Sequence, residues 1–149
     1  MSATVSGAIK SVIESGGLSI IAYRDAAPSR PDPVTGDPVV AVALPYVTVR
    51  ERIGMSVDRD GAFDRGVPHT VTETVSVDLW QQWRDPATGK SGGESYDLAD
   101  RLARLLHGAA LPSAPTRVYG VRVAGRTRLL ESEANVVHDI ITLTVRREQ

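Results

Sequence analysis

The chain has 149 residues, the size of one domain, and its 42% hydrophobic and 23% charged residues are typical of a globular protein. It contains no apolar run near the ~18 residues that a membrane helix needs, and its start lacks the features of a secretory signal. We therefore expect a soluble protein made in a cytoplasm. The absence of cysteine excludes disulfides, thiolate catalysis and cysteine-based zinc sites, and a net charge of −1 gives no global attraction to nucleic acid.

The first third of the chain predicts a helix, a short strand and a long loop. Apolar residues recur at helical spacing over Ala3–Ser15, and Gly16 and Gly17 follow as residues that end a helix. Leu18–Tyr23 has the character of a short strand. The next segment, Arg24–Pro45, holds five prolines, which lack the amide donors of a helix or a central strand, so we expect a long loop there.

The middle of the chain predicts two strands separated by a second loop. Tyr46–Arg52 alternates as a strand does, and Gly54–Pro68 is broken by charges and glycines. A half-buried strand of about ten residues then begins at Val71. Its apolar face holds Val71, Val75, Val77 and Leu79, and its polar face holds Thr72, Thr74, Ser76 and Asp78. Trp80 lies on the polar face and Trp83 follows near the strand end, which favours a subunit contact for these rings.

The last third predicts one helix followed by strands. Ser91 with Glu94 has the form of a capping box, and Ser95 is an equally good N-cap. An apolar stripe follows, and Gly108 is placed to end the helix. The stripe consists of Leu98, Leu102, Leu105 and Leu106 with Ala99 and Ala103.

The strands after this helix form a hairpin and a closing strand in our interpretation. Val118–Val123 and Arg126–Glu133 are the hairpin strands, with Ala124 and Gly125 as the turn. The closing strand has Val137, Ile141, Leu143 and Val145 on one face, with Asp139 as the exception, and His138, Thr142, Thr144 and Arg146 on the other. The chain as a whole, residues 1–149, predicts a single α+β domain: a mostly antiparallel β-sheet with two α-helices packed on one face and long loops between the early strands.

Metal binding has weak support in the sequence. Asp58, Asp60 and Asp64 resemble part of a calcium loop, but Gly61 comes too early and His69 stands where such a loop has a bidentate glutamate. The histidines lie far apart in the chain, so only the fold could assemble them into a site. We therefore expect no metal and no cofactor.

Catalysis has equally weak support. Asp78 and Asp139 could act as a pair of carboxylates if the fold joined them, and with His138 they motivate an alternative, a small hydrolase. The simpler interpretation places Asp78 in solvent and Asp139 at a bend, beside an arginine or at a subunit contact. No G-x-S-x-G motif occurs, and GKSGG at residues 89–93 is only a fragment of a phosphate-binding loop.

A cluster of arginines, Arg122, Arg126 and Arg128, follows the predicted helix. It could bind nucleic acid or an acidic protein surface. Glu131 and Glu133 come directly after it and favour pairing of these charges within or between subunits.

Several segments of the sequence, taken in chain order, resemble the tail terminator, or tail-completion, proteins of siphophages. They are an N-terminal helix, LPYVTV after a proline-rich loop, VSVDLWQQW on a strand, the helix DLADRLARLL and the closing RLLESEANVVHDIITLTV. The resemblance spans nearly the whole chain and rests on the order of these parts. It implies a structural virion protein without enzyme activity.

The resemblance also implies an assembly. It implies a ring of six copies of the chain at the head-proximal end of a long tail. The other expected partners are the tail tube protein and a head–tail connector or neck protein. The ring would stop tube polymerisation and join the head, with DNA passing through the lumen. The alternative within this class is a head-completion or neck connector protein. The candidate contact residues are Trp80, Trp83, Arg122, Arg126, Arg128, Asp58, Asp60 and Asp64. We expect the loops Arg24–Leu44 and Gly54–Pro68 to be mobile in a free subunit.

Overall fold

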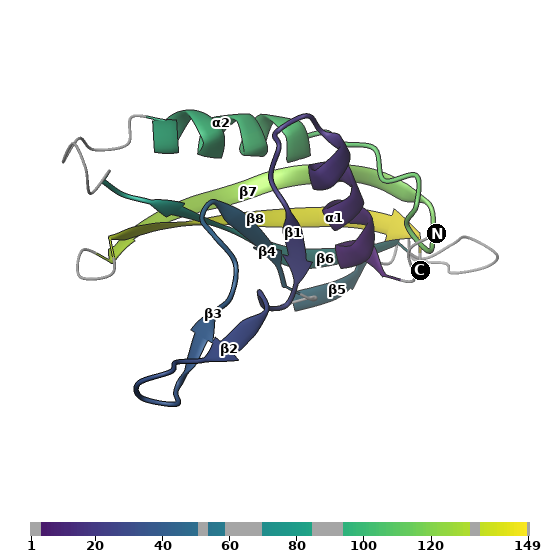
Figure 1. Cartoon of the computed structure of the whole chain (residues 1–149). Coiled ribbons are helices and arrows are strands. Elements are labelled where there is room, and N and C mark those ends of the chain that lie inside the picture. Colours follow the sequence, from purple (N-terminus) through teal and green to yellow (C-terminus); the bar gives the residue numbers. More distant parts are fainter. Residues whose placement is uncertain (1–3, 51–53, 59–69, 85–93, 132–134, 149) are drawn as a thin grey trace.

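The computed structural model describes residues 4–50, 54–58, 70–84, 94–131 and 135–148. Its elements are α1 Val5–Ser15, β1 Ala22–Arg24, β2 Ser29–Pro31, β3 Pro38–Val40, β4 Tyr46–Val49, β5 Gly54–Asp58, β6 Thr70–Gln82, α2 Glu94–Leu106, β7 Val118–Glu131 and β8 Val136–Glu148. Both helices cover one side of the main sheet, and the β2–β3 hairpin projects on the other side (Figure 1). This is the expected α+β fold. Neither described helix combines the length and the apolar character that crossing a membrane requires.

The main sheet has the strand order β1-β4-β6-β8-β7, with β5 also paired to β6. Only the β1–β4 pair is parallel, and the other pairs are antiparallel. At the centre, β6 and β8 pair along their full lengths, from Thr70 opposite Glu148 to Gln82 opposite Val136. The two long strands predicted from alternating residues are therefore confirmed, and they form the rigid middle of the molecule.

The side chains of β6 and β8 alternate between a helix face, which α1 and α2 cover, and an open face on the opposite side. The middle of the helix face is apolar because most alternate residues of these strands are valine, leucine or isoleucine, with Glu73, Gln81, Asp139 and Arg147 as the exceptions. The core there consists of Val75, Val77, Leu79, Ile141, Leu143 and Val145 from the sheet with Ile9, Ile13, Leu102 and Leu106 from the helices. This burial fixes the register, since a shift by one residue would expose the whole apolar set.

Helix α1 ends at Ser15 as predicted, but it begins at Val5 and not at Ala3. The hydroxyl of Thr4 accepts a hydrogen bond from the Gly7 amide at 3.1 Å and so caps the first turn. At the other end, a Cβ at Gly16 would clash with Cδ2 of Leu105 in α2 unless that side chain moved. Gly16 therefore allows the close approach of α1 to α2.

The segment predicted as one long loop contains a hairpin, which we call the arm (residues 28–41). Backbone bonds join Ala41 N to Pro28 O and Asp32 N to Asp37 O, each at 2.8 Å. Hydrogen-bonded and non-bonded pairs alternate in an antiparallel ladder, so the facing prolines, Pro31 and Pro38, occupy a non-bonded pair. The loop prediction was wrong because no amide is required at that position.

Two further predictions need correction. The second predicted loop begins with a strand, because Gly54–Asp58 forms β5 and pairs with Thr70–Thr74 of β6. The predicted hairpin around Ala124 and Gly125 is instead one continuous strand, β7, which pairs with β8. Register shifts at Val118/Gly120 and Val123/Gly125 show that glycine here accommodates bulges and does not reverse the chain.

Other element boundaries differ in smaller ways. The predicted strand Leu18–Tyr23 is reduced to β1, which includes Arg24, and Tyr46–Arg52 is reduced to β4. In α2, Ser95 lies inside the helix and does not cap it, while Ser91 lies outside the described residues. Gly108 has a φ of +75° and follows the helix as predicted.

Candidate interaction surfaces

A row of rings crosses the open face of the sheet from β1 to β8. Tyr23 meets Tyr46 edge to face with centroids 6.3 Å apart, and Tyr46 stacks on Trp80 at 6.2 Å. Trp80 in turn stacks on His138 at 3.6 Å, with planes 12° apart. The row forms because these residues occupy facing positions in the register, Tyr46 opposite Trp80 and Trp80 opposite His138. Trp80 thus lies on the polar-side face, as predicted, and is partly exposed.

Burial in this row affects Tyr46, whose side chain lies next to Trp80. Loss of water around the phenol raises the pKa of Tyr46 above its usual value of 10.0, and the negative charge of Glu131 acts in the same direction. The indole N–H of Trp80 lies 3.4 Å from the hydroxyl of Thr48. The row therefore combines ring packing with hydrogen-bonding groups.

Asp78 lies beside this row and is buried, with 1% of its side chain exposed, so the prediction that it projects into solvent was wrong. Its Oδ1 accepts a hydrogen bond of 2.7 Å from Ser76. Its Oδ2 lies 3.0 Å from Nε of Arg50 and 3.4 Å from Nε2 of His138. The guanidinium and the hydroxyl offset the cost of burying the carboxylate.

This arrangement does not match a hydrolase. A catalytic triad places histidine between the serine and the carboxylate, whereas here Asp78 lies between Ser76 and His138. The ring of Trp80 also covers the imidazole. Asp139 cannot join Asp78, because their neighbouring register positions point to opposite faces of the sheet: Asp139 faces Leu79, and Asp78 faces Ile140. The geometry therefore gives the hydrolase alternative no support.

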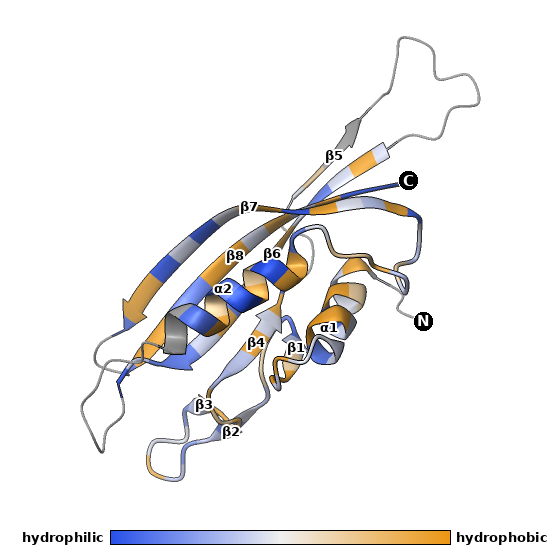
Figure 2. Cartoon of the chain, turned by 90° about the horizontal axis from the view of Figure 1, so that it is seen from above, coloured by the Kyte–Doolittle hydropathy of each residue, from blue (hydrophilic) through white to orange (hydrophobic). Residues whose placement is uncertain are grey.

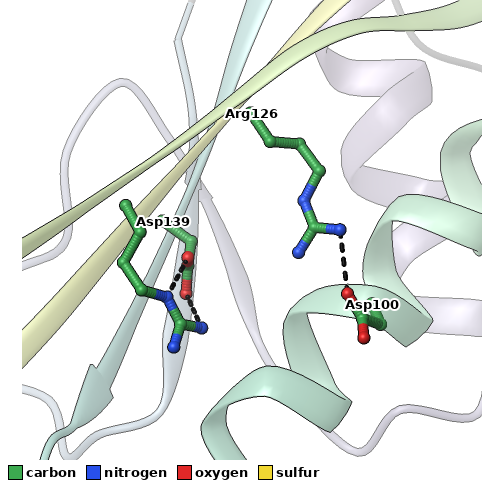
Figure 3. Close-up of polar contacts among 4 residues, drawn as sticks. Asp100, Arg126 and Asp139 are labelled. Atoms are coloured by element: carbon green, nitrogen blue, oxygen red, sulfur yellow. Dashed lines mark hydrogen bonds and ion pairs between the residues drawn. The ribbon is translucent and has the colours of Figure 1, made fainter.

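The predicted arginine cluster lies on the edge strand β7, and two of its members have partners on the helix face (Figure 3). Arg128 holds Asp139 with two hydrogen bonds of 2.7 and 2.9 Å. Arg126 reaches Asp100 of α2 at 2.8 Å. Of the three roles considered for Asp139, the one beside an arginine is observed. Glu133, one of the two glutamates considered as partners of the cluster, lies outside the described residues. Arg122, the third member, is exposed.

A groove of about 550 Å³ lies between α2 and β7. Its lining, which we call the α2–β7 groove, is Asp100, Ala103, Arg104, His107, Val123 and Arg126. His107 accepts a hydrogen bond at Nδ1 from the Val123 amide at 3.1 Å, at the edge of the β7 bulge. The imidazole therefore satisfies a strand amide. Figure 2 shows that hydrophilic and hydrophobic residues alternate along α2.

The arm is the second exposed feature. Among the described elements, β2 and β3 pack substantially only against each other. Of residues 28–41, only Asp32 and Val39 are partly covered. Val34 at the tip is 90% exposed and Val40 is 48% exposed. A two-stranded hairpin with no further packing is marginally stable in water, so an apolar arm of this kind favours contact with another surface.

The remaining predicted site residues are dispersed. Trp83 is partly exposed, with the guanidinium of Arg84 4.1 Å from its ring centroid. Asp58 is the last residue of β5, and Asp60, Asp64 and His69 lie outside the described residues. Within the described part of the chain, no group of histidine, aspartate and glutamate side chains could hold a metal ion. Sequence reasoning missed the arm and the groove, although the exposed Pro–Val–Thr–Gly turn at 33–36 was a usable signal for the arm.

Comparisons with known proteins agree with this fold. No protein-family model matches the chain, and no curated protein matches it. Among solved structures, a chain from the virion of a native gene transfer agent particle is similar, with a TM-score of 0.65 and 15% sequence identity. The match covers 98% of this chain and 96% of that chain. At this identity the likeness shows a shared fold over the whole length of both chains.

Proposed function

We propose that this chain is a structural virion protein of the tail-terminator type, acting as a single domain over residues 1–149. Six copies form a ring at the head-proximal end of a long tail, where the ring stops growth of the tail tube and joins the tail to a head–tail connector. DNA passes through its lumen as cargo. In this proposal the protein has no catalytic residues and needs no cofactor.

The observation that carries the proposal is the likeness in fold to a component of a phage-like virion over nearly all of both chains. The resemblance of the sequence segments, in their order, to siphophage tail terminators is an observation independent of this structural similarity. The arm supports it further, because it is an exposed projection without a substantial partner in its own described chain. A projection on one side and a groove on another suit a head-to-tail contact, which closes into a ring when the rotation between subunits is right.

The test is binding to tail tubes assembled from the tube protein of the same particle. The purified protein should cap one end of each tube and prevent its further elongation, as seen by electron microscopy and by tube length. Binding to the connector but not to tube ends would instead favour the neck-protein alternative. Absence of binding to both would contradict a role at this joint.

A further inference from the structure

We propose that the tip of the arm of one subunit docks in the α2–β7 groove of the next subunit. This inference rests on the ring of the proposed function and names the surfaces that make its contact. The occupant is therefore a second copy of this chain, through residues 32–37.

The tip of the arm is ordered by its own hydrogen bonds. Oδ1 of Asp32 accepts from the amides of Val34 and Thr35 at 2.7 and 3.4 Å, and the Gly36 amide donates to the Asp32 carbonyl at 2.8 Å. Gly36 has a φ of +75°, which glycine adopts without strain. These bonds define the shape that the tip presents to a partner, and docking would hold the tip in that shape.

The tip presents one apolar side chain, Val34, and two carboxylates, Asp32 and Asp37. Val34 is 90% exposed, and the neighbouring Asp37 is exposed as well. Asp32 uses its carboxylate within the turn, whereas the carboxylate of Asp37 makes no hydrogen bond or ion pair with another described residue. The tip therefore offers a valine side chain beside one available negative charge.

The groove offers the complementary pair. Ala103 and Val123 supply apolar surface, and Arg104 supplies a guanidinium that has no ion pair with any described residue. The other groove arginine, Arg126, is already held by Asp100. The volume of about 550 Å³ falls within the ~300–1,000 Å³ of clefts that hold small ligands, which is enough for the end of a tight turn.

A subunit cannot fill its own groove in this way. The arm projects from the side of the sheet opposite the helices, while the groove lies on the helix side along β7 (Figure 1). The contact must therefore join the open-face side of one subunit to the helix side of another. Such a contact is heterologous and leaves a free arm at one end of an open chain and a free groove at the other end, so addition of subunits continues until the ring closes.

Disulfide trapping tests this contact directly, because the chain has no cysteine of its own. Full-length protein carrying Val34→Cys is mixed with protein carrying Arg104→Cys under mild oxidation, and the disulfide-linked dimer is measured. The control replaces Arg104→Cys with Arg101→Cys, on the same helix but outside the groove lining. We expect the groove pair to form at least about tenfold faster than the control pair, because docking raises the effective concentration of its two thiols.

Charge exchange supplies a second measurement. Asp37→Arg and Arg104→Asp should each weaken association by about tenfold or more, because each places like charges together, and the double variant should recover most of the loss. Arg101→Asp is the matched control and should leave association near the wild-type level. Circular dichroism on every variant checks that the fold is kept.

The outcomes separate this inference from the proposed function. Equal trapping rates for the groove and control pairs would overturn the inference, whether or not rings are present. If those equal rates accompany normal rings on tube ends, the proposed function stands and another surface makes the contact. Selective trapping without any binding to tubes or connectors would support the contact and contradict the terminator role.

Discussion

The indole of Trp80 lies flat on the imidazole of His138, with centroids 3.6 Å apart, and both rings stand on the face of the sheet opposite the helices. The two residues are directly paired in neighbouring central strands. Trp80 thereby shields His138 and, through it, the buried carboxylate of Asp78. A tryptophan that breaks an alternating pattern serves here as a cover for a polar cluster.

Replacing Trp80 with alanine should therefore lower the free energy of unfolding by about 3 kcal/mol, because it removes a stacked ring and uncovers buried polar groups. Urea denaturation measures the loss. Trp83→Ala is the control, since the ring contact seen for Trp83 is with the exposed Arg84, and it should cost clearly less. Equal losses for the two variants would contradict the covering role of Trp80.

The contacts of Asp78 with Ser76 and Arg50 predict two losses of stability of different size. Ser76→Ala removes one hydrogen bond of 2.7 Å and should cost about 1 kcal/mol. Asp78→Ala also removes the partner of Arg50 and should cost about 2 kcal/mol. Chemical denaturation of both single variants and the double variant tests the coupling, and fully additive losses would show that Ser76 and Asp78 act independently.

The two arginines of β7 should differ in importance although they lie two residues apart. Arg128→Ala leaves the buried Asp139 without its bidentate partner and should destabilise the fold by about 3 kcal/mol. Arg126→Ala breaks an exposed pair with Asp100 and should cost less than about 1 kcal/mol. A thermal unfolding series compares them, and a larger effect at Arg126 would count against the geometry of Figure 3.

The raised pKa of Tyr46 predicts how the stability of the fold changes at high pH. Burial raises the pKa of its phenol above the unfolded value of 10.0, so the folded state disfavours the phenolate. The resulting stabilisation is fully present below pH 10.0 and is lost as the pH rises through the higher folded-state pKa. Tyr46→Phe should flatten the fall in stability above that pH. An unchanged slope in denaturation curves across this range would refute the assignment.

The arm predicts a change in hydrogen exchange on assembly. In a free subunit the amides of Asp32, Gly36 and Ala41 should exchange rapidly, because the hairpin lacks a packed partner. Assembly into rings should slow them, while the amides of β6 stay slow in both states. Arm amides that already exchange slowly in the monomer would argue against docking of the arm.

The parts of the fold that followed from sequence are those governed by a single strong periodicity. The alternating valines of β6 and the leucine stripe of α2 each define one buried face, so their elements were predictable. The arm was not, because whether Pro31 and Pro38 interrupt a ladder depends on which pair they occupy. Similarly, Gly125 can turn a chain or bulge a strand, and only the pairing of β7 with β8 decides between them.

The candidate surfaces were harder to predict than the fold. The arginines of β7 and the unusual position of Trp80 were visible in the sequence, but their partners were not. We expected Asp78 in solvent because its face of the strand is polar, but Arg50 and His138, both distant in the chain, lie against its buried carboxylate. The groove depends on the packing of α2 against β7, and no local sequence pattern encodes how far apart these two elements lie.

The most direct test of the central claim is electron microscopy of the purified protein over a range of concentrations and in the presence of tail tubes, combined with mass measurement in solution. We expect six-fold rings with a central hole, either free in solution at high concentration or bound to one end of each tube. A protein that remains monomeric at every concentration and leaves both tube ends bare would contradict it.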